Sequence, residues 1–244
     1  MIVCEVGLNH LGNEDYSLTY VDFLSKTKCD AITYQIREDE FYQRDKYKNY
    51  NLSFDHYAEL AKATNKKFGL SLAEPKLLTS CESVDPDFYK VLSWHLSNYS
   101  YIDRLLSETE KSIYVSTGTS SIDQLDDFYK RYGENRRINF IHTQLTKDPK
   151  DANLKSIKFL KDRYPYEIGF GNHSENSSVI LGSVVFEPSS LWFYVRGATY
   201  NWRFHPDEFW AIPLDDVDSL IDDIQIVKSS LGNETKTSTN TKGY

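Results

Sequence analysis

Hydrophobic residues along this 244-residue chain gather in short runs that alternate with longer amphipathic stretches from one end to the other. The runs are rich in Val, Ile, Phe and Tyr and are bounded by polar turns, which is typical of buried strands. Eight strands are predicted in this way, at residues 2–8, 30–36, 67–73, 88–93, 112–116, 138–142, 166–170 and 190–195.

The stretches between the runs repeat their apolar residues with helical spacing and carry helix end signals. Asn13 and Ser53 stand where N-caps are expected, and Gly133 and Gly232 follow the ends of two helices. Acidic residues occupy the first turn of the last helix, as the helix dipole favours. The predicted helices cover residues 13–27, 53–65, 97–111, 120–133, 150–164, 177–187 and 213–232.

Eight strands that alternate with helices over about 230 residues predict an α/β fold, a (β/α)8 TIM barrel. A doubly wound open sheet is the alternative, but it usually has fewer strands and often a glycine-rich loop after the first one. The first loop here reads NHLGN and holds no GxGxxG motif. We expect one barrel domain over residues 1–232 and a disordered polar tail over residues 233–244.

Composition excludes several functional classes. The net charge is −8 and the pI is about 5.3, so the chain lacks the basic stripe that nucleic-acid binding requires. Cys4, Cys29 and Cys81 form no CxxC motif, which indicates free thiols in a reducing compartment. No secretory signal is visible, and no apolar run approaches the ~20 residues that span a bilayer. We therefore expect a cytoplasmic protein that binds neither nucleic acid nor membrane.

Candidate chemistry lies at the carboxyl ends of the predicted strands, where TIM barrels carry their active sites. Four of the six histidines fall there, namely His10, His95, His142 and His173. A single histidine at such a place is more often a hydrogen-bonded loop residue, whereas four at one mouth favour a functional site. Two or three imidazoles together would suit Zn or Mn.

Two charged residues, Glu5 and Lys90, lie inside strands whose other residues are apolar. A buried structural ion pair is one interpretation, but such pairs are costly to desolvate and add little stability. Charges inside a barrel near its mouth therefore favour a functional role. The STG sequence at residues 116–118 is either a plain turn or a source of hydroxyl and N–H groups for a phosphate or carboxylate.

Seven segments bring these residues into one pattern: CEVGLNHLGN, DAITYQIRE, FYKVLSWHLSN, IYVSTGTSSIDQL, IHTQLTKDPKDANLKSIKFLKDRY, IGFGNHSEN and HPDEFWAIPLDDVDSLIDDIQIVKSSLG. In this order, over residues 2–232, they resemble the sialic acid synthase family. The resemblance implies an aldolase-type TIM barrel that condenses phosphoenolpyruvate with an open-chain 2-acetamido sugar aldehyde. The products are a nonulosonic acid and phosphate, and a divalent metal, usually Mn or Mg, polarises the aldehyde.

The resemblance also implies roles for individual residues. Glu5, Lys90 and His173 are the predicted catalytic residues, with Glu5 near the reacting centre and Lys90 at the anionic donor. His173 is the predicted metal ligand for Mn, Mg or Zn, with His10, His95 or His142 beside it. Substrate contacts are predicted at Asn9, Gln35, Ser93, His95, Ser116 and Asp207.

The chain also departs from the family pattern. The family's second-strand lysine is Thr33 here, its third-strand threonine is Leu72, and its fourth-strand glutamate is His95. No second metal-binding histidine stands near residues 194–196, and the strand-six loop lacks the family's Asn and Tyr. Losing one lysine removes a charge-assisted contact worth ~1.5–3 kcal/mol to a trianionic donor. Either Arg37 or Arg196 is a candidate to replace it.

Two functions stay open at this point. The chain is either a C–C bond-forming transferase of surface-glycan biosynthesis or a catalytically degenerate barrel that binds a sugar or a partner protein. The resemblance implies a C-terminal antifreeze-like domain in the family, and we expect this chain, which is given up to Tyr244, to be without it. We therefore also expect a homodimer or a separate antifreeze-like chain as a partner. An exposed apolar rim at the mouth would accompany it, with residues 190–195 and 200–204 as aromatic candidates.

Overall fold

The computed structural model describes residues 1–198, 204–233 and 235–236 of the chain. Eight parallel strands pair in chain order, and the eighth pairs back with the first, so the sheet closes into a barrel. They are β1 (Ile2–Gly7), β2 (Ala31–Ile36), β3 (Lys67–Leu72), β4 (Phe88–Val91), β5 (Ser112–Ser116), β6 (Ile138–Thr143), β7 (Glu167–Asn172) and β8 (Leu191–Arg196). The eight predicted strands and the TIM barrel are therefore confirmed. A short strand, β9 (Ile212–Pro213), pairs with the end of β8.

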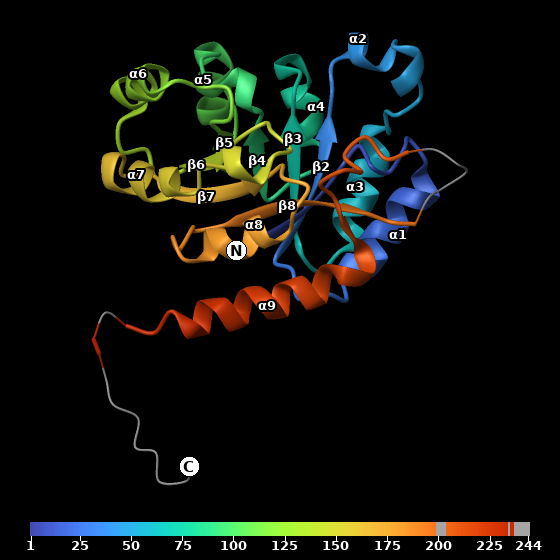
Figure 1. Ribbon diagram of the computed structural model, residues 1–244. Coiled ribbons are helices and arrows are strands. Elements are labelled where there is room, and N and C mark those ends of the chain that lie inside the picture. The colour runs from blue at the N-terminus through green and yellow to red at the C-terminus, as the bar shows by residue number, and fades with distance from the viewer. Residues whose placement is uncertain (199–203, 234, 237–244) are drawn as a thin grey trace, which may run out of the picture.

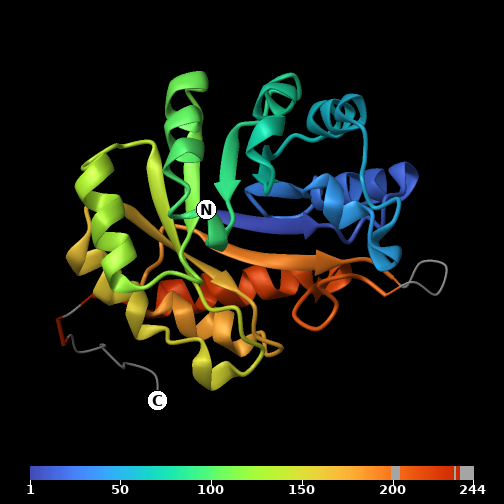
Figure 2. The same ribbon diagram turned by 90° about the horizontal axis from the view of Figure 1, so that it is seen from above.

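Helices surround the strands on the outside of the barrel (Figures 1 and 2). They are α1 (Glu14–Leu24), α2 (Asp39–Tyr42), α3 (Phe54–Ala63), α4 (Leu78–Glu82), α5 (Tyr99–Glu108), α6 (Ile122–Tyr132), α7 (Lys155–Arg163), α8 (Ser178–Val184) and α9 (Val217–Ser230). All seven predicted helices are present, and α9 packs beside α8. The sequence did not predict α2 and α4, because helices of four and five residues are too short to show a periodic pattern.

The helix end signals work as expected. The Asn13 side chain accepts a hydrogen bond from the Tyr16 N–H at 2.7 Å, and Ser53 accepts one from the His56 N–H at 3.1 Å. At the end of α6, Gly133 has φ of +55° and donates its N–H to the Tyr129 carbonyl. Local sequence therefore defines where these helices begin and end.

The lower half of the barrel is filled by an apolar cluster of Val3, Ala31, Phe88, Ile141 and Trp192. The rings of Phe88 and Trp192 meet edge to face, with their centroids 5.7 Å apart. Gly69 leaves the room for this packing, because a Cβ there would lie 2.1 Å from the Phe88 ring. Only the carboxyl-terminal half of the barrel is thus left for polar side chains.

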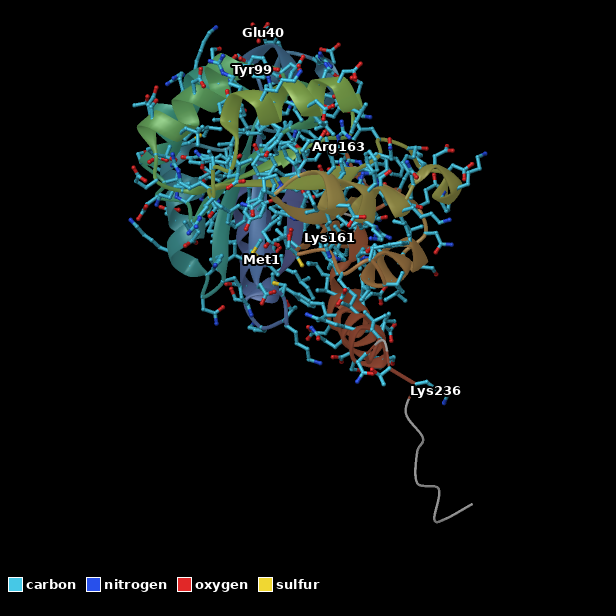
Figure 3. All side chains as sticks on the ribbon, turned by 90° about the vertical axis from the view of Figure 1, so that its left-hand side faces the viewer. Met1, Glu40, Tyr99, Lys161, Arg163 and Lys236 are labelled. Carbon is cyan, nitrogen blue, oxygen red and sulfur yellow. The ribbon has the colours of Figure 1, made fainter. Side chains whose placement is uncertain are left out.

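Polar contacts tie the outer helices together. Arg163 of α7 donates from Nε to Asp126 of α6 at 2.9 Å, and Lys161 reaches the Glu187 carbonyl after α8. Figure 3 shows both side chains on the outer surface, with Glu40 at the opposite end of the molecule from Lys236.

Two sequence expectations concern the C-terminal tail and the aromatic segment at residues 200–204. Most of the predicted tail, and residues 200–203 of the aromatic segment 200–204, lie outside the described residues. Within the described ranges, every helix is too short or too polar to cross a membrane.

Candidate functional site

Every second side chain of a barrel strand points inward, and above the apolar cluster these inward side chains become polar. A small cavity with about 50 Å³ of free space opens there, at the carboxyl ends of the strands. Its polar lining comes from β2, β4, β5, β6, β7 and the loop after β4, and consists of Gln35, Lys90, Ser93, Ser116, Thr143 and His173. Four predicted substrate or catalytic positions besides His173 are thus brought to one place.

The base of this cavity holds a buried ion pair. The Lys90 ammonium donates to the Glu5 carboxylate, and the two residues are only 4% and 3% exposed. The ammonium also lies 5.3 Å from the Trp192 ring centroid and 5.9 Å from that of Tyr194. Each charge depends on the other, because an unpaired charge at such a depth is strongly unfavourable.

Hydroxyl groups surround the ion pair. Those of Thr33 and Ser71 are buried and have no hydrogen-bond partner among the described residues. On the opposite side, Ser93 Oγ accepts the Gly118 N–H at 3.2 Å. Buried hydroxyls without protein partners are places where water or a ligand binds.

His173 stands at the wall of the cavity between two aromatic rings. Its ring centroid lies 5.5 Å from that of Tyr194 and 5.5 Å from that of Trp210. Burial, and to a smaller degree the charge of Lys90, lowers the pKa of His173 to about 3. The imidazole is therefore neutral near pH 7 and offers a lone pair or a single N–H rather than a positive charge.

Asp207, another predicted substrate residue, lies in the loop between β8 and β9 and does not line the cavity. Its backbone N–H donates to Asn9 Oδ1 at 3.2 Å, and Asn9 Nδ2 donates to the Val195 carbonyl at 2.8 Å. Asn9 is fully buried and does not line the cavity, and its contacts hold the backbone of Asp207 beside β8. Burial, reinforced by the negative charge of Glu5, raises the pKa of Asp207 to about 7.

Arg37 provides a second cation near the mouth. Its guanidinium lies 4.0 Å from the Phe41 ring centroid and 5.2 Å from that of Trp94, and Nε donates to Glu38 at 2.8 Å. Its charge lowers the pKa of Asp207, which places it within electrostatic reach of the site. Arg196, the other candidate, instead lines a separate hollow beside Phe23 and Asp215.

The other three predicted histidines do not join His173. His95 Nε2 donates to the Ala73 carbonyl at 2.8 Å, and His142 Nε2 donates to the Ala152 carbonyl at 3.1 Å. His10 Nδ1 accepts the Gly12 N–H at 3.1 Å, and its ring packs near Tyr34. Of the four predicted histidines, only His173 is among the residues that line the cavity.

Trp210 contacts His173 and is a residue that the sequence did not indicate. It follows Asp207 by three residues in a loop without a regular pattern, and its ring packs against His173. Only its spacing from the predicted Asp207 could have suggested a place at the mouth.

The sequence model of the NeuB family matches residues 19–236. The chain belongs to the NeuB family. It is 22% identical to the pseudaminic acid synthase of Campylobacter jejuni over 263 residues. This alignment covers 95% of this chain and 74% of that protein. It is 25% identical over 242 residues to the spore coat polysaccharide biosynthesis protein SpsE of Bacillus subtilis, with 85% of this chain and 64% of that protein covered.

The fold agrees with this NeuB membership. The crystal structure of the N-acetylneuraminic acid synthetase from Leptospira borgpetersenii in complex with citrate superposes with a TM-score of 0.85 at 18% identity. The match covers 98% of this chain and 87% of that one. The similarity to sialic acid synthases that the sequence motifs indicated is thereby confirmed at the level of family and fold.

The NeuB resemblance also implies a divalent metal, which the side chains of this chain do not fit. No three His, Cys, Asp or Glu residues in the described part of the chain lie together as metal ligands would. No second histidine stands near residues 194–196, and Glu5 is already engaged by Lys90.

Proposed function

We propose that this NeuB-family chain condenses phosphoenolpyruvate with the aldehyde of a 2-acetamido sugar, forming a nonulosonic acid for surface-glycan biosynthesis. The observation that carries the proposal is Lys90 at the base of the cavity, paired with Glu5 and facing the hydroxyls of Ser93 and Ser116. An ammonium group surrounded by hydroxyls suits the phosphate and carboxylate of a small anionic donor. The names of relatives that synthesise acidic sugars support the same class of reaction.

The donor needs more space than the structure leaves open. About 50 Å³ holds one or two water molecules, which each take ~30 Å³. Trp94 and Leu145 line the cavity and are 46% and 49% exposed, so their side chains are free to turn outward. We propose that they do so when the donor enters.

The assay that tests the proposal follows phosphate release. The purified chain is incubated with phosphoenolpyruvate and a panel of 2-acetamido sugars, with and without Mn²⁺. We expect release that requires both the donor and one of the sugars. If no sugar of the panel gives phosphate release, and calorimetry shows no binding of phosphoenolpyruvate, the proposed synthase function is wrong.

The alternative is a degenerate barrel that binds a sugar without turning it over. Two observations favour this alternative: the cavity is small, and the described residues include no group of three His, Cys, Asp or Glu side chains that could hold a metal. The same experiment separates the two, because a degenerate barrel binds a sugar in calorimetry but releases no phosphate. A partner chain over the mouth stays a prediction, and light scattering of the purified protein tests it.

Arg37 is the second cation that we propose for the donor, in place of the missing lysine at position 33. Arg37→Ala is expected to weaken phosphoenolpyruvate binding about 10- to 100-fold, because it removes one charge-assisted contact. Arg44 is the matched control, since it also lies over the Phe41 ring, at 5.4 Å, but is exposed. Calorimetry should show Arg44→Ala unchanged, and an unchanged Arg37→Ala would exclude Arg37 from the donor site.

A further inference from the structure

The Lys90 amine is a nucleophile that a molecule in the cavity can reach. Lys90 lies on β4, between Ser71 of β3 and Tyr114 of β5, and its side chain lines the cavity. It is only 4% exposed, so bulk water has little access to it. Lysine amines form Schiff bases with carbonyl compounds, and a buried position protects the imine from premature hydrolysis.

Lys90 has a proton acceptor in direct contact. Its ammonium carries three N–H donors, and Glu5 is the hydrogen-bond acceptor that the described residues provide for it. Transfer of one proton to Glu5 leaves an amine and a carboxylic acid, both uncharged, at a depth where charged groups are costly. The amine then has a lone pair, which the ammonium lacks. The same ion pair can therefore supply a nucleophile to the cavity.

The groups around the amine fit a 2-oxo acid. The hydroxyls of Ser93 and Ser116 line the cavity, and Ser93 Oγ accepts the Gly118 N–H at 3.2 Å, which leaves its own proton for a carboxylate. The ring centroids of Trp192 and Tyr194 lie 5.3 Å and 5.9 Å from Nζ and provide an apolar wall. A carboxylate held by the hydroxyls brings the adjoining carbonyl carbon towards the amine.

Charge and size make pyruvate the simplest 2-oxo acid for this place. Lys90 and Glu5 together carry no net charge, so each further negative charge in the cavity has to be buried without a matching cation. Pyruvate lacks the phosphate group of phosphoenolpyruvate and brings a single negative charge. The free space of about 50 Å³ therefore has to open less for pyruvate than for phosphoenolpyruvate.

We infer that Lys90 forms a Schiff base with the C2 carbonyl of pyruvate and so gives the chain a second, phosphate-free condensation. For its sugar acceptor, this inference rests on the proposed function. The second reaction joins pyruvate itself to the aldehyde of a 2-acetamido sugar, and it forms the same class of acidic sugar without releasing phosphate.

The reaction needs no co-reactant beyond the two substrates. Lys90 gives a proton to Glu5 and attacks C2, and the carbonyl oxygen leaves as water with the proton from Glu5. Glu5 then takes a proton from C3, and the electron pair of the resulting enamine forms the bond to the aldehyde carbon. The aldehyde oxygen takes that proton from Glu5. Water finally hydrolyses the iminium, which releases the 2-oxo sugar acid and restores the Lys90 ammonium.

Trapping with borohydride tests the inference on the unmodified protein. The chain is incubated with pyruvate and sodium borohydride, which reduces an imine to a stable amine, and is then digested for mass spectrometry. We expect the Lys90 peptide to gain the mass of one pyruvic acid less one oxygen atom, at a rate that saturates with pyruvate. Lys130, whose side chain is 74% exposed, is the internal control and should react at least about 100-fold more slowly.

Glu5→Gln tests the proton acceptor, because an amide can hold the Lys90 amine but cannot take its proton. Trapping at Lys90 should slow by about 10²- to 10⁴-fold in this variant. Asp127→Asn removes the exposed partner of Lys130 in the same way, and it is the matched control that should trap pyruvate at Lys90 like the unmodified protein. An unchanged trapping rate in Glu5→Gln would contradict the proton transfer.

The remaining outcomes separate this inference from the proposed function. A Lys90 that stays unmodified, or that reacts no faster than Lys130, would overturn the Schiff base and leave phosphate release from phosphoenolpyruvate unaffected. Trapping at Lys90 without any acidic sugar from pyruvate and the 2-acetamido sugar panel would overturn the second reaction. An acidic sugar formed from pyruvate, with no phosphate release from phosphoenolpyruvate, would uphold the Schiff base and sink the phosphoenolpyruvate reaction.

Discussion

Lys90→Met is expected to cost about 3–5 kcal/mol of unfolding free energy at neutral pH and to weaken phosphoenolpyruvate binding at least 10- to 100-fold. The stability loss follows from Glu5, which stays 3% exposed and loses its partner. The binding loss follows from removal of the cation at the base of the cavity. Urea denaturation and calorimetry measure the two effects separately. This loss is large, because the whole free energy of unfolding of a globular protein is only about 5–15 kcal/mol.

The double variant Glu5→Gln, Lys90→Met separates stability from binding. It leaves no uncompensated charge, so most of the lost stability should return, whereas donor binding should stay weak. Lys130→Met is the surface control, because its partner Asp127 and Lys130 itself are well exposed, and its effect should be small. A Lys90→Met protein that is stable and binds the donor normally would contradict both the buried pair and the proposed donor site.

Tyr194→His is expected to create a metal site by placing a second imidazole beside His173. Tyr194 lies on the strand next to His173, with 5.5 Å between the ring centroids, and both side chains line the cavity. Two imidazoles with a nearby carboxylate such as Asp207 form a ligand set that suits Zn²⁺ or Mn²⁺. At a metal concentration of 100 times Kd, the stabilisation should be about 2.7 kcal/mol.

Thermal melts with and without Zn²⁺, together with metal analysis of the dialysed protein, measure this gain. Tyr194→Phe is the control for the lost hydroxyl, and Tyr194→His with His173→Ala removes one of the two imidazoles; neither should bind. Equal metal binding by the unmodified protein would show that its own side chains suffice, and would return the proposed reaction to a metal-assisted one.

The strands and most helices were predictable because their signals are local. Runs such as residues 30–36 alternate with capped helices, and each signal acts over a few residues. The motifs also placed Lys90, Ser93 and Ser116 at neighbouring strand ends, since parallel strands of a barrel open on the same face. The short helices α2 and α4 were not predicted, because they bury too few side chains to form a pattern in the sequence.

The histidines show what a position at a strand end leaves open. His142 ends a strand as the sequence indicated, but its side chain points to the Ala152 carbonyl in the loop before α7. Position at a strand end does not settle which side of the strand a residue occupies, because each successive residue points to the opposite face. Register and the loop that follows decide it.

By itself, the sequence determined the order of strands and helices, the family, and the residue types available at the mouth. Only the tertiary structure joined Glu5 to Lys90, 85 residues away, and tied Asp207 to Asn9 across 198 residues. Only it removed His10, His95 and His142 from the cavity. The physical reason is that burial and long-range charge set the pKa of a group and the cost of leaving it unpaired, and neither exists before the barrel closes.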